Sequence, residues 1–188
     1  MVKLVNILLM LLIFLSASFI HAQEIVNSLY YAKLGSAYPP GDSSNILPSF
    51  GLGARFQRGH YGWDLSLNLA SAVFINYASL KGMFLFYPQT ETKYPLYLGF
   101  GSGIGYHLSS VPMGQPFGSR SSEYGNVTLE GILGYEFRHA SHFKTFIQLE
   151  LSQPAFGFGG HQHRYSYRPG IAFTAGFGDR KSTRLNSS

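Results

Sequence analysis

Residues 96–108 read LYLGFGSGIGYHL, and glycine occupies every second position from Gly99 to Gly105. A phosphate-binding glycine loop joins a strand to a helix, but no helical periodicity follows Gly105. The stretch instead alternates between a small face and an apolar face, which is the pattern of a β-strand. We therefore predict a strand here and no nucleotide site. The apolar face comprises Leu96, Leu98, Phe100, Ile104, Tyr106 and Leu108.

The same period of two recurs along the chain, whereas helical periodicity is hard to find. Long connections rich in Gly, Ser and Pro, at residues 36–45, 109–123 and 154–164, alternate with tight ones at 59–62 and 139–141. No repeat or linker marks a second domain. The eight predicted strands cover residues 28–35, 48–57, 63–73, 79–87, 96–108, 127–137, 145–152 and 165–177.

The N-terminus has the parts of a secretory signal peptide. Lys3 precedes an apolar run from Leu4 to Ile20, and a small residue, Ala22, stands at the expected cleavage position. The alternative is a transmembrane anchor, because the run is nearly long enough to span a bilayer. Polar residues within the run and the absence of a positive flank after it favour a signal peptide over residues 1–22.

The C-terminal residues 179–188 read DRKSTRLNSS and can be back-translated into a continuous sequencing-adapter sequence. We interpret them as an artefact, to be left out of fold reasoning; the alternative is a genuine basic tail. The folded domain is then expected over residues 23–178, ending just before its natural C-terminus.

Charge and cysteine content exclude several classes of protein. The 188 residues contain 14 Lys and Arg against 9 Asp and Glu. Without the two ends, which hold the cations Lys3, Arg180, Lys181 and Arg184 and the anion Asp179, 10 cations face 8 anions. This balance predicts no nucleic-acid partner. Cysteine is absent, so disulfides and thiolate metal sites are excluded.

Two all-β folds are compatible with this alternation. A soluble sandwich buries its apolar faces, whereas a transmembrane barrel turns them to lipid and fills its lumen with small and charged residues. The signal peptide, the eight strands and the scarcity of charge on the polar faces favour an eight-stranded antiparallel up-and-down transmembrane barrel with short periplasmic turns and longer outer loops. Aromatic residues near predicted strand ends suggest interfacial girdles: Tyr30, Tyr31, Trp63, Phe86, Tyr87, Tyr94, Tyr106, Tyr135, Phe137, Tyr165, Tyr167 and Phe177.

The alternation, strand count and loop asymmetry of residues 28–178 resemble the small outer-membrane barrels of the OmpA membrane-domain, OmpX and OmpW types. The resemblance implies a location in the bacterial outer membrane, with lipid around the wall and the long loops outside. Residues 172–178, AFTAGFG, look like the final strand that the barrel-insertion machinery recognises in such families. The resemblance is one of pattern and carries no specific motif.

Charged residues on the predicted lumen face are the sharpest candidate site. Counted along their strands, four of them fall at similar heights near the middle of the barrel. A three-residue turn at 139–141 would place Glu130 opposite Glu150, so two cations are needed to neutralise this pair. We predict a plug formed by Lys81, Glu130, Glu150 and Arg168, and secondary lumen pairs of Arg55 with Asp64 and Glu136 with Lys144.

An enzymatic function is disfavoured. The lipid A deacylases resemble this chain in strand pattern and use a His-x-Ser motif, but the comparable place reads Glu150-Leu151-Ser152 and lacks the histidine that would act as base. The other match to the motif, His139-Ala140-Ser141, falls in a predicted periplasmic turn, which faces away from a substrate in the outer leaflet. His161 and His163 have no evident third ligand, so no metal site is predicted, and no cofactor is expected.

The sequence thus predicts a small outer-membrane barrel with a charge-plugged lumen and a structural or surface-interaction role, with an extracellular ligand contacted through the outer loops. The first alternative is a narrow channel for small apolar solutes. The second is a lipid-modifying barrel enzyme.

Overall fold

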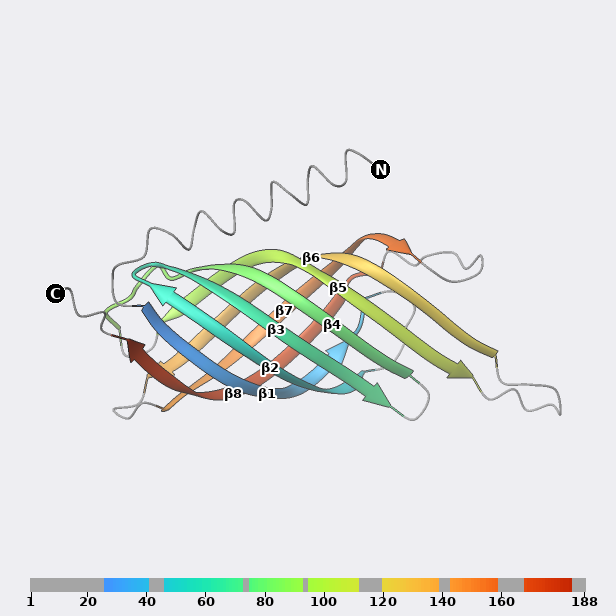
Figure 1. Ribbon diagram of the computed structural model, residues 1–188, viewed down its shortest axis with the longest axis horizontal. Helices are drawn as coiled ribbons and strands as arrows, with labels where there is room; N and C mark the ends of the chain where they lie inside the picture. The colour runs from blue at the N-terminus through green and yellow to red at the C-terminus, as the bar shows by residue number, and fades with distance from the viewer. Residues whose placement is uncertain are drawn as a thin grey trace.

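A computed structural model describes residues 26–40, 46–72, 75–92, 95–111, 120–138, 143–158 and 168–183. Every strand pairs antiparallel with its sequence neighbours, and β1 pairs with β8, so one sheet closes into a barrel (Figure 1). The predicted all-β, eight-stranded up-and-down barrel is confirmed. The strands are β1 (Val26–Tyr38), β2 (Leu47–Arg58), β3 (Tyr61–Ala72), β4 (Ile75–Phe86), β5 (Leu96–Val111), β6 (Arg120–Arg138), β7 (Phe143–Phe158) and β8 (Gly170–Thr183).

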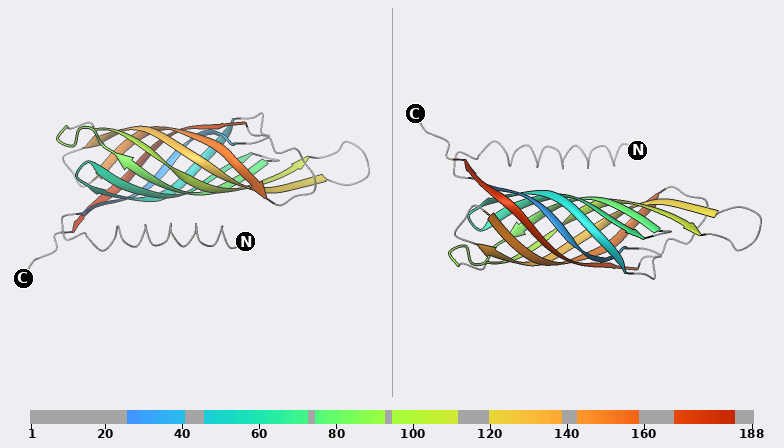
Figure 2. Two further views of the ribbon diagram at one scale, coloured as in Figure 1. Left: turned by 90° about the horizontal axis from the view of Figure 1, so that it is seen from above. Right: turned by 90° about the horizontal axis from the view of Figure 1, so that it is seen from below.

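The two ends of the barrel differ in their connections. At one end, called here the turn end, the strands join at residues 59–60, 87–95 and 139–142, and β1 begins and β8 ends there. The other end, called the loop end, holds the connections 39–46, 73–74, 112–119 and 159–169. At the loop end β5 and β6 continue past their neighbours as a two-stranded extension, which Figure 2 shows from two sides.

Several strands extend into segments expected to be loops. Residues 36–38 belong to β1, residues 109–111 and 120–123 belong to β5 and β6, and residues 154–158 belong to β7. A bulge lets β7 continue: Val127 pairs with Phe156 but Thr128 pairs with Pro154, so one extra residue turns Phe156 outward.

Strand β8 lies later in the sequence than predicted. It begins at Gly170, not at residue 165, and pairs with β1 as far as Thr183, opposite Val26. It therefore includes five residues of the segment that was set aside as an artefact. The expected signal peptide, residues 1–22, lies outside the described residues.

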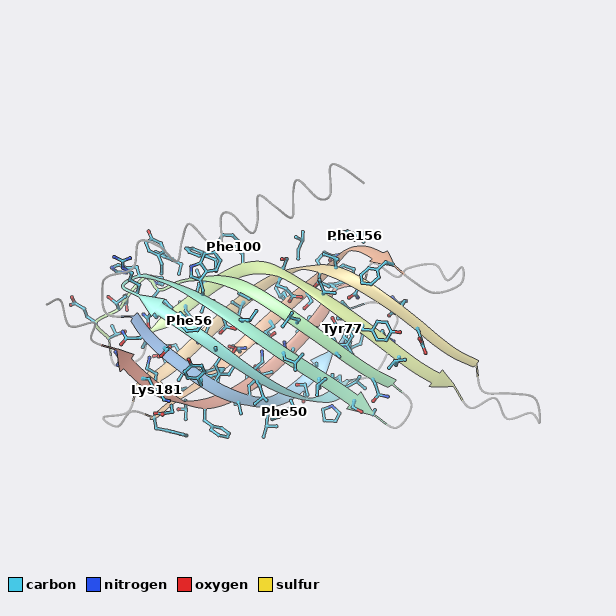
Figure 3. All side chains as sticks on the ribbon, viewed as in Figure 1. Phe50, Phe56, Tyr77, Phe100, Phe156 and Lys181 are labelled. Atoms are coloured by element: carbon cyan, nitrogen blue, oxygen red, sulfur yellow. The ribbon has the colours of Figure 1, made fainter. Side chains whose placement is uncertain are left out.

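The barrel has an apolar outer face and a polar interior. Large apolar side chains point outward along every strand; Phe100 is 68% exposed and Leu67 is 48% exposed (Figure 3). Lys33, Arg55 and Glu136 point inward and are at most 2% exposed. This arrangement contradicts the soluble sandwich, in which the apolar faces would be buried. Among the described residues, no helix is both long and apolar enough to cross a membrane.

Most of the described aromatic residues expected in girdles lie on the outer face, but Tyr31 and Tyr87 point inward and are buried. Tyr94, Tyr165 and Tyr167 lie outside the described residues. The glycines of residues 99–105 line the interior, as the alternation predicts. A Cβ atom at Gly105 would overlap both the Tyr77 hydroxyl and the Asn126 amide, so glycine makes room for these larger inward side chains.

Candidate functional site: two ion-pair clusters in the lumen

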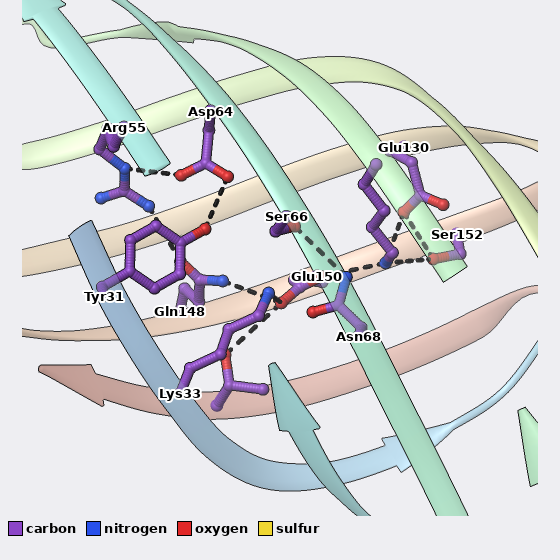
Figure 4. Close-up of polar contacts among 12 residues, drawn as sticks. Tyr31, Lys33, Arg55, Asp64, Ser66, Asn68, Glu130, Gln148, Glu150 and Ser152 are labelled. Carbon is purple, nitrogen blue, oxygen red and sulfur yellow. Dashed lines mark hydrogen bonds and ion pairs between the residues drawn. The ribbon is translucent and has the colours of Figure 1, made fainter. Parts of the chain in front are cut away.

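The middle of the lumen holds a group of buried charges, the central cluster, made of Lys33, Lys81, Glu130, Glu150 and Ser152. Figure 4 labels Lys33, Glu130, Glu150 and Ser152 of this cluster. The ammonium of Lys81 on β4 lies at its centre. Its Nζ donates hydrogen bonds of 2.9 Å to Glu130 and 2.9 Å to Glu150, and one of 3.2 Å to Ser152. One cation therefore neutralises parts of two carboxylates that come from different strands.

Lys33 on β1 supplies the second cation of the central cluster, a residue that the sequence analysis missed. Its Nζ lies 2.5 Å from Oε1 of Glu150. The predicted partner, Arg168, is instead exposed and precedes the first residue of β8. The prediction for Arg168 was wrong because β8 lies further along the chain than the alternation suggested. The signal for Lys33 was present, since it is the one charged residue within predicted strand 28–35.

Both carboxylates of the central cluster accept several hydrogen bonds. Oε1 of Glu150 accepts from Lys33, from Gln148 at 2.8 Å and from Thr174 at 3.5 Å, and Oε2 accepts from Lys81. Glu130 accepts from Ser152 at 2.6 Å and from Thr128 at 2.5 Å in addition to Lys81. A buried charge is tolerated when it is paired and hydrogen-bonded. Two lysines and two glutamates make the cluster neutral.

A second group of charges, the turn-end cluster, comprises Arg55, Asp64, Glu136 and Lys144. Arg55 Nε donates a 2.8 Å hydrogen bond to Asp64, and Nη1 of Arg55 lies 3.9 Å from Glu136. Lys144 forms an ion pair with Glu136. Both predicted secondary pairs are therefore in contact, within one network that contains two cations and two anions. Tyr31 adds a 2.7 Å hydrogen bond from its hydroxyl to Asp64.

The guanidinium of Arg55 is surrounded by aromatic rings. Its Cζ lies 4.4 Å from the ring centroid of Tyr97 and 5.0 Å from that of Phe146, within the range of cation–π contacts. Its Nη2 donates to the Gln148 side-chain oxygen at 3.3 Å. Because Gln148 also donates to Glu150, it connects the turn-end cluster to the central cluster.

Apolar side chains fill much of the remaining lumen. Towards the turn end, two groups of buried residues pack beside the ion pairs, and towards the loop end a third group packs with Ala37. An eight-stranded barrel is narrow enough for side chains to fill. The three groups are Met83, Leu85, Tyr87, Tyr97 and Ile132; Leu29, Tyr31 and Phe146; and Leu47, Ala70 and Tyr77.

The register between β6 and β7 differs from the predicted one by two residues. Glu130 lies opposite Ser152, and Glu150 lies opposite Ile132. Arg138 and Lys144 form the last pair before the connection, so five residues, 139–143, separate the paired positions where the prediction had three. A shift of two residues keeps every side chain on the same face, so Glu130 and Glu150 still enter the lumen, where Lys81 lies between them.

Of the residues considered for enzymatic chemistry, Glu150 and Ser152 lie in the described part of the chain. Ser152, the serine of the deacylase-like position, donates to Glu130 and accepts from Lys81. No group of three or more potential metal-binding side chains occurs among the described residues. His107 is buried on the lumen face and stacks on Tyr124 with ring centroids 4.8 Å apart. His139, His142, His161 and His163 lie outside the described residues.

Sequence comparisons assign no family: no family model and no curated protein matches the chain. Solved structures do match. Neisserial surface protein A superposes with a TM-score of 0.59 at 10% identity, over 83% of this chain and 98% of that chain. The chain has the fold of the small eight-stranded outer-membrane β-barrels.

Two further members of this barrel class show the same likeness. Ail, the attachment invasion locus protein of Yersinia pestis, has a TM-score of 0.50 at 19% identity, over 84% of this chain and 97% of that chain. The outer membrane protein OprG from Pseudomonas aeruginosa has a TM-score of 0.50 at 12% identity, over 85% and 96%. At these identities the shared property is the barrel fold.

Proposed function

We propose that the protein is a non-conducting barrel of the bacterial outer membrane with a structural or surface-contact role. The observation that carries this proposal is the filled lumen, in which two neutral ion-pair clusters and apolar packing occupy successive layers. Paired charges held by several hydrogen bonds are costly to separate. The lumen is therefore expected to resist the passage of ions and solutes.

The outer face supports a membrane location. An apolar wall separates two belts of aromatic side chains, as in outer-membrane barrels. At the turn end, Tyr61, Trp63, Phe84 and Phe86 contact one another, with Trp63 and Phe84 centroids 5.3 Å apart. At the loop end, Tyr106, Phe156 and Phe158 are exposed. Lipid is thus the proposed partner of the wall, and the barrel-insertion machinery is the proposed route of assembly.

The loop end supports a surface-contact role. If both termini face the periplasm, the two-stranded extension of β5 and β6 projects outside the cell. Tyr106 donates a 2.8 Å hydrogen bond to Glu123 across these two strands, which stiffens the base of the extension. An extracellular ligand would be contacted by this extension and the neighbouring loops.

Conductance of the refolded chain in planar lipid bilayers tests the proposal. The unaltered barrel is expected to show little conductance, and Glu130→Ala and Glu150→Ala are each expected to lower stability and increase leakage. The exposed residue Glu91 supplies a control, Glu91→Ala, that should change neither property. Steady conductance of the unaltered barrel, or uptake of small apolar solutes that changes in the variants without a loss of stability, would favour a narrow channel instead.

A further inference from the structure

A small cavity, called here the loop-end cavity, lies on the loop-end side of the central cluster. Lys33, Lys81 and Glu150 of that cluster line it. Pro39 and Pro40, which directly follow β1, line it as well. Strand β1 runs from the turn end to the loop end, so Lys33 precedes the two prolines along the barrel. The cavity therefore lies between the central cluster and these prolines.

Pro39 and Pro40, called here the proline strap, are turned towards the interior of the barrel. Side chains of a strand alternate between its two faces, and Pro39 continues the inward series of Lys33, Gly35 and Ala37. The side chain of Pro39 is less than 2% exposed, and Pro40 is also buried. Because Gly35 and Ala37 are small, space is left between Lys33 and the strap. The strap thus covers the loop-end side of the cavity.

The strap packs on Gly170, the first residue of β8. A Cβ atom at Gly170 would lie 2.6 Å from the backbone nitrogen of Pro40, 2.7 Å from Cδ of Pro40 and 2.8 Å from the carbonyl oxygen of Tyr38. These distances are too short for a real contact with a side chain. Only glycine at position 170 lets the strap approach β8 this closely, so β8 provides a seat for the strap.

Two consecutive prolines make the strap stiff. Proline fixes its own φ angle and restricts the backbone of the residue before it. Neither proline has an N–H group, and the β1–β8 ladder ends at the pair of Tyr38 with Ile171. The strap can therefore move without losing an N–H hydrogen bond of its own, and its stiffness makes the two residues move together.

We propose that the proline strap is a lid of the lumen. Seated on Gly170, it keeps water-soluble molecules on the loop-end side away from the loop-end cavity and the central cluster; displaced as one unit, it admits them. Ion pairs that are buried are screened by salt much less than exposed ones, so the closed lid preserves the attraction between Lys33 and Glu150. This lid is separate from the ion pairs and does not depend on whether the barrel conducts.

Cysteine labelling tests the lid, because the chain contains no cysteine of its own. Ser49 lines the loop-end cavity and its hydroxyl is buried, so Ser49→Cys reports access to the cavity. The refolded barrel in detergent is treated with the water-soluble reagent sulfonatoethyl methanethiosulfonate, and labelling is followed by mass spectrometry. Labelling should be slow compared with Ser71→Cys, whose side chain is exposed near the loop end. Equal rates would show that the cavity is open and would overturn the proposal.

Two kinds of change displace the strap. The double substitution Pro39→Gly with Pro40→Gly frees its backbone, and Gly170→Ala overpacks the seat of Pro40. Each is expected to speed the labelling of Ser49→Cys about tenfold, from the usual size of such effects. Gly82→Ala is the matched control, because no atom lies within 4 Å of the added Cβ, and should leave the rate unchanged. Unchanged labelling in both strap variants would overturn the proposal.

Ser66→Cys separates opening of the lid from loosening of the whole barrel. Ser66 is a buried lumen serine that lies nearer the turn end and does not line the cavity. Its cysteine should stay unlabelled when the strap is displaced, while heated and unheated gel mobility shows that the barrel remains folded. If labelling of Ser66→Cys rises together with that of Ser49→Cys, the strap variants loosen the barrel as a whole, and the strap is not a lid.

Discussion

The side-chain amide of Gln148 donates a 2.8 Å hydrogen bond to Oε1 of Glu150, two residues further along the inner face of β7. The carbonyl oxygen of the same amide accepts hydrogen bonds from Arg55 at 3.3 Å and from Tyr97 at 2.8 Å. Gln148 therefore links the two neutral clusters of the lumen into one network.

This link predicts energetic coupling between Gln148 and Glu150. In a double-mutant cycle with Gln148→Leu and Glu150→Gln, the effects on the free energy of unfolding should differ from additivity by about 0.5–3 kcal/mol, as for residues within one network. Denaturant unfolding in lipid vesicles measures each variant. A cycle of Gln148→Leu with the distant exposed Arg58→Gln is the control and should be additive. Additivity in both cycles would show that the clusters act independently.

Lys81→Met should destabilise the barrel strongly. The substitution leaves parts of two buried carboxylates without their shared cation, and removing one partner of a buried ion pair costs about 3–5 kcal/mol. The same measurement on Arg58→Met, which removes an exposed cation near the turn end, is expected to give a loss below about 1 kcal/mol. Comparable losses in the two variants would argue against a structural role for the central cluster.

Gly134→Ala should destabilise the barrel because the added Cβ would overlap the ring of Tyr97, which is fully buried. Overpacking of this kind costs about 1–3 kcal/mol. Gly82→Ala is the matched control: Gly82 also lies within a strand, and no atom lies within 4 Å of the added Cβ. Heated and unheated gel mobility together with denaturant unfolding would report both variants. An equal free energy of unfolding for the two variants would mean that the Tyr97 ring moves aside without a loss of stability.

Leu67→Arg tests the membrane location. Leu67 points outward in the middle of β3, opposite Leu52 and Leu80. An arginine at the bilayer midplane of a barrel costs about 2–4 kcal/mol, and the cost falls to about 0–1 kcal/mol near the interfaces. Ser71→Arg, outward and near the loop end of the same strand, is therefore expected to be tolerated. Equal costs at the two depths, or a barrel that stays soluble without detergent, would contradict a membrane-spanning wall.

Local alternation was sufficient to predict which glutamates face the lumen, although it misplaced Arg168. Glu130, Glu136 and Glu150 enter it although the register of β6 against β7 differs from the predicted one, because a shift of two residues preserves the face. Glu136 and Lys144 also meet in the lumen, because both point to the inner face and they are diagonal neighbours on the adjacent strands β6 and β7. The existence of paired charges in the lumen could therefore be predicted without knowing the register.

The composition of the central cluster could not be predicted in this way. Arg168 continues the alternation that precedes β8, but β8 begins at Gly170, which pairs with Ser152 of β7, and Arg168 lies outside the strand and is exposed. Lys33, on the opposite side of the closing seam, comes within 2.5 Å of Glu150, 117 residues away in sequence. The alternation within a single strand does not show which residues of distant strands come into contact.

The sequence by itself determined the number of strands and the face to which the residues within each strand alternate, because a strand's period of two is a local property of the backbone. Tertiary structure alone decided which charges meet, how Gln148 connects them and where a cavity is left. Those features depend on the position of each residue along the barrel axis. Closure of the barrel sets the register of all eight strands together and therefore sets these positions.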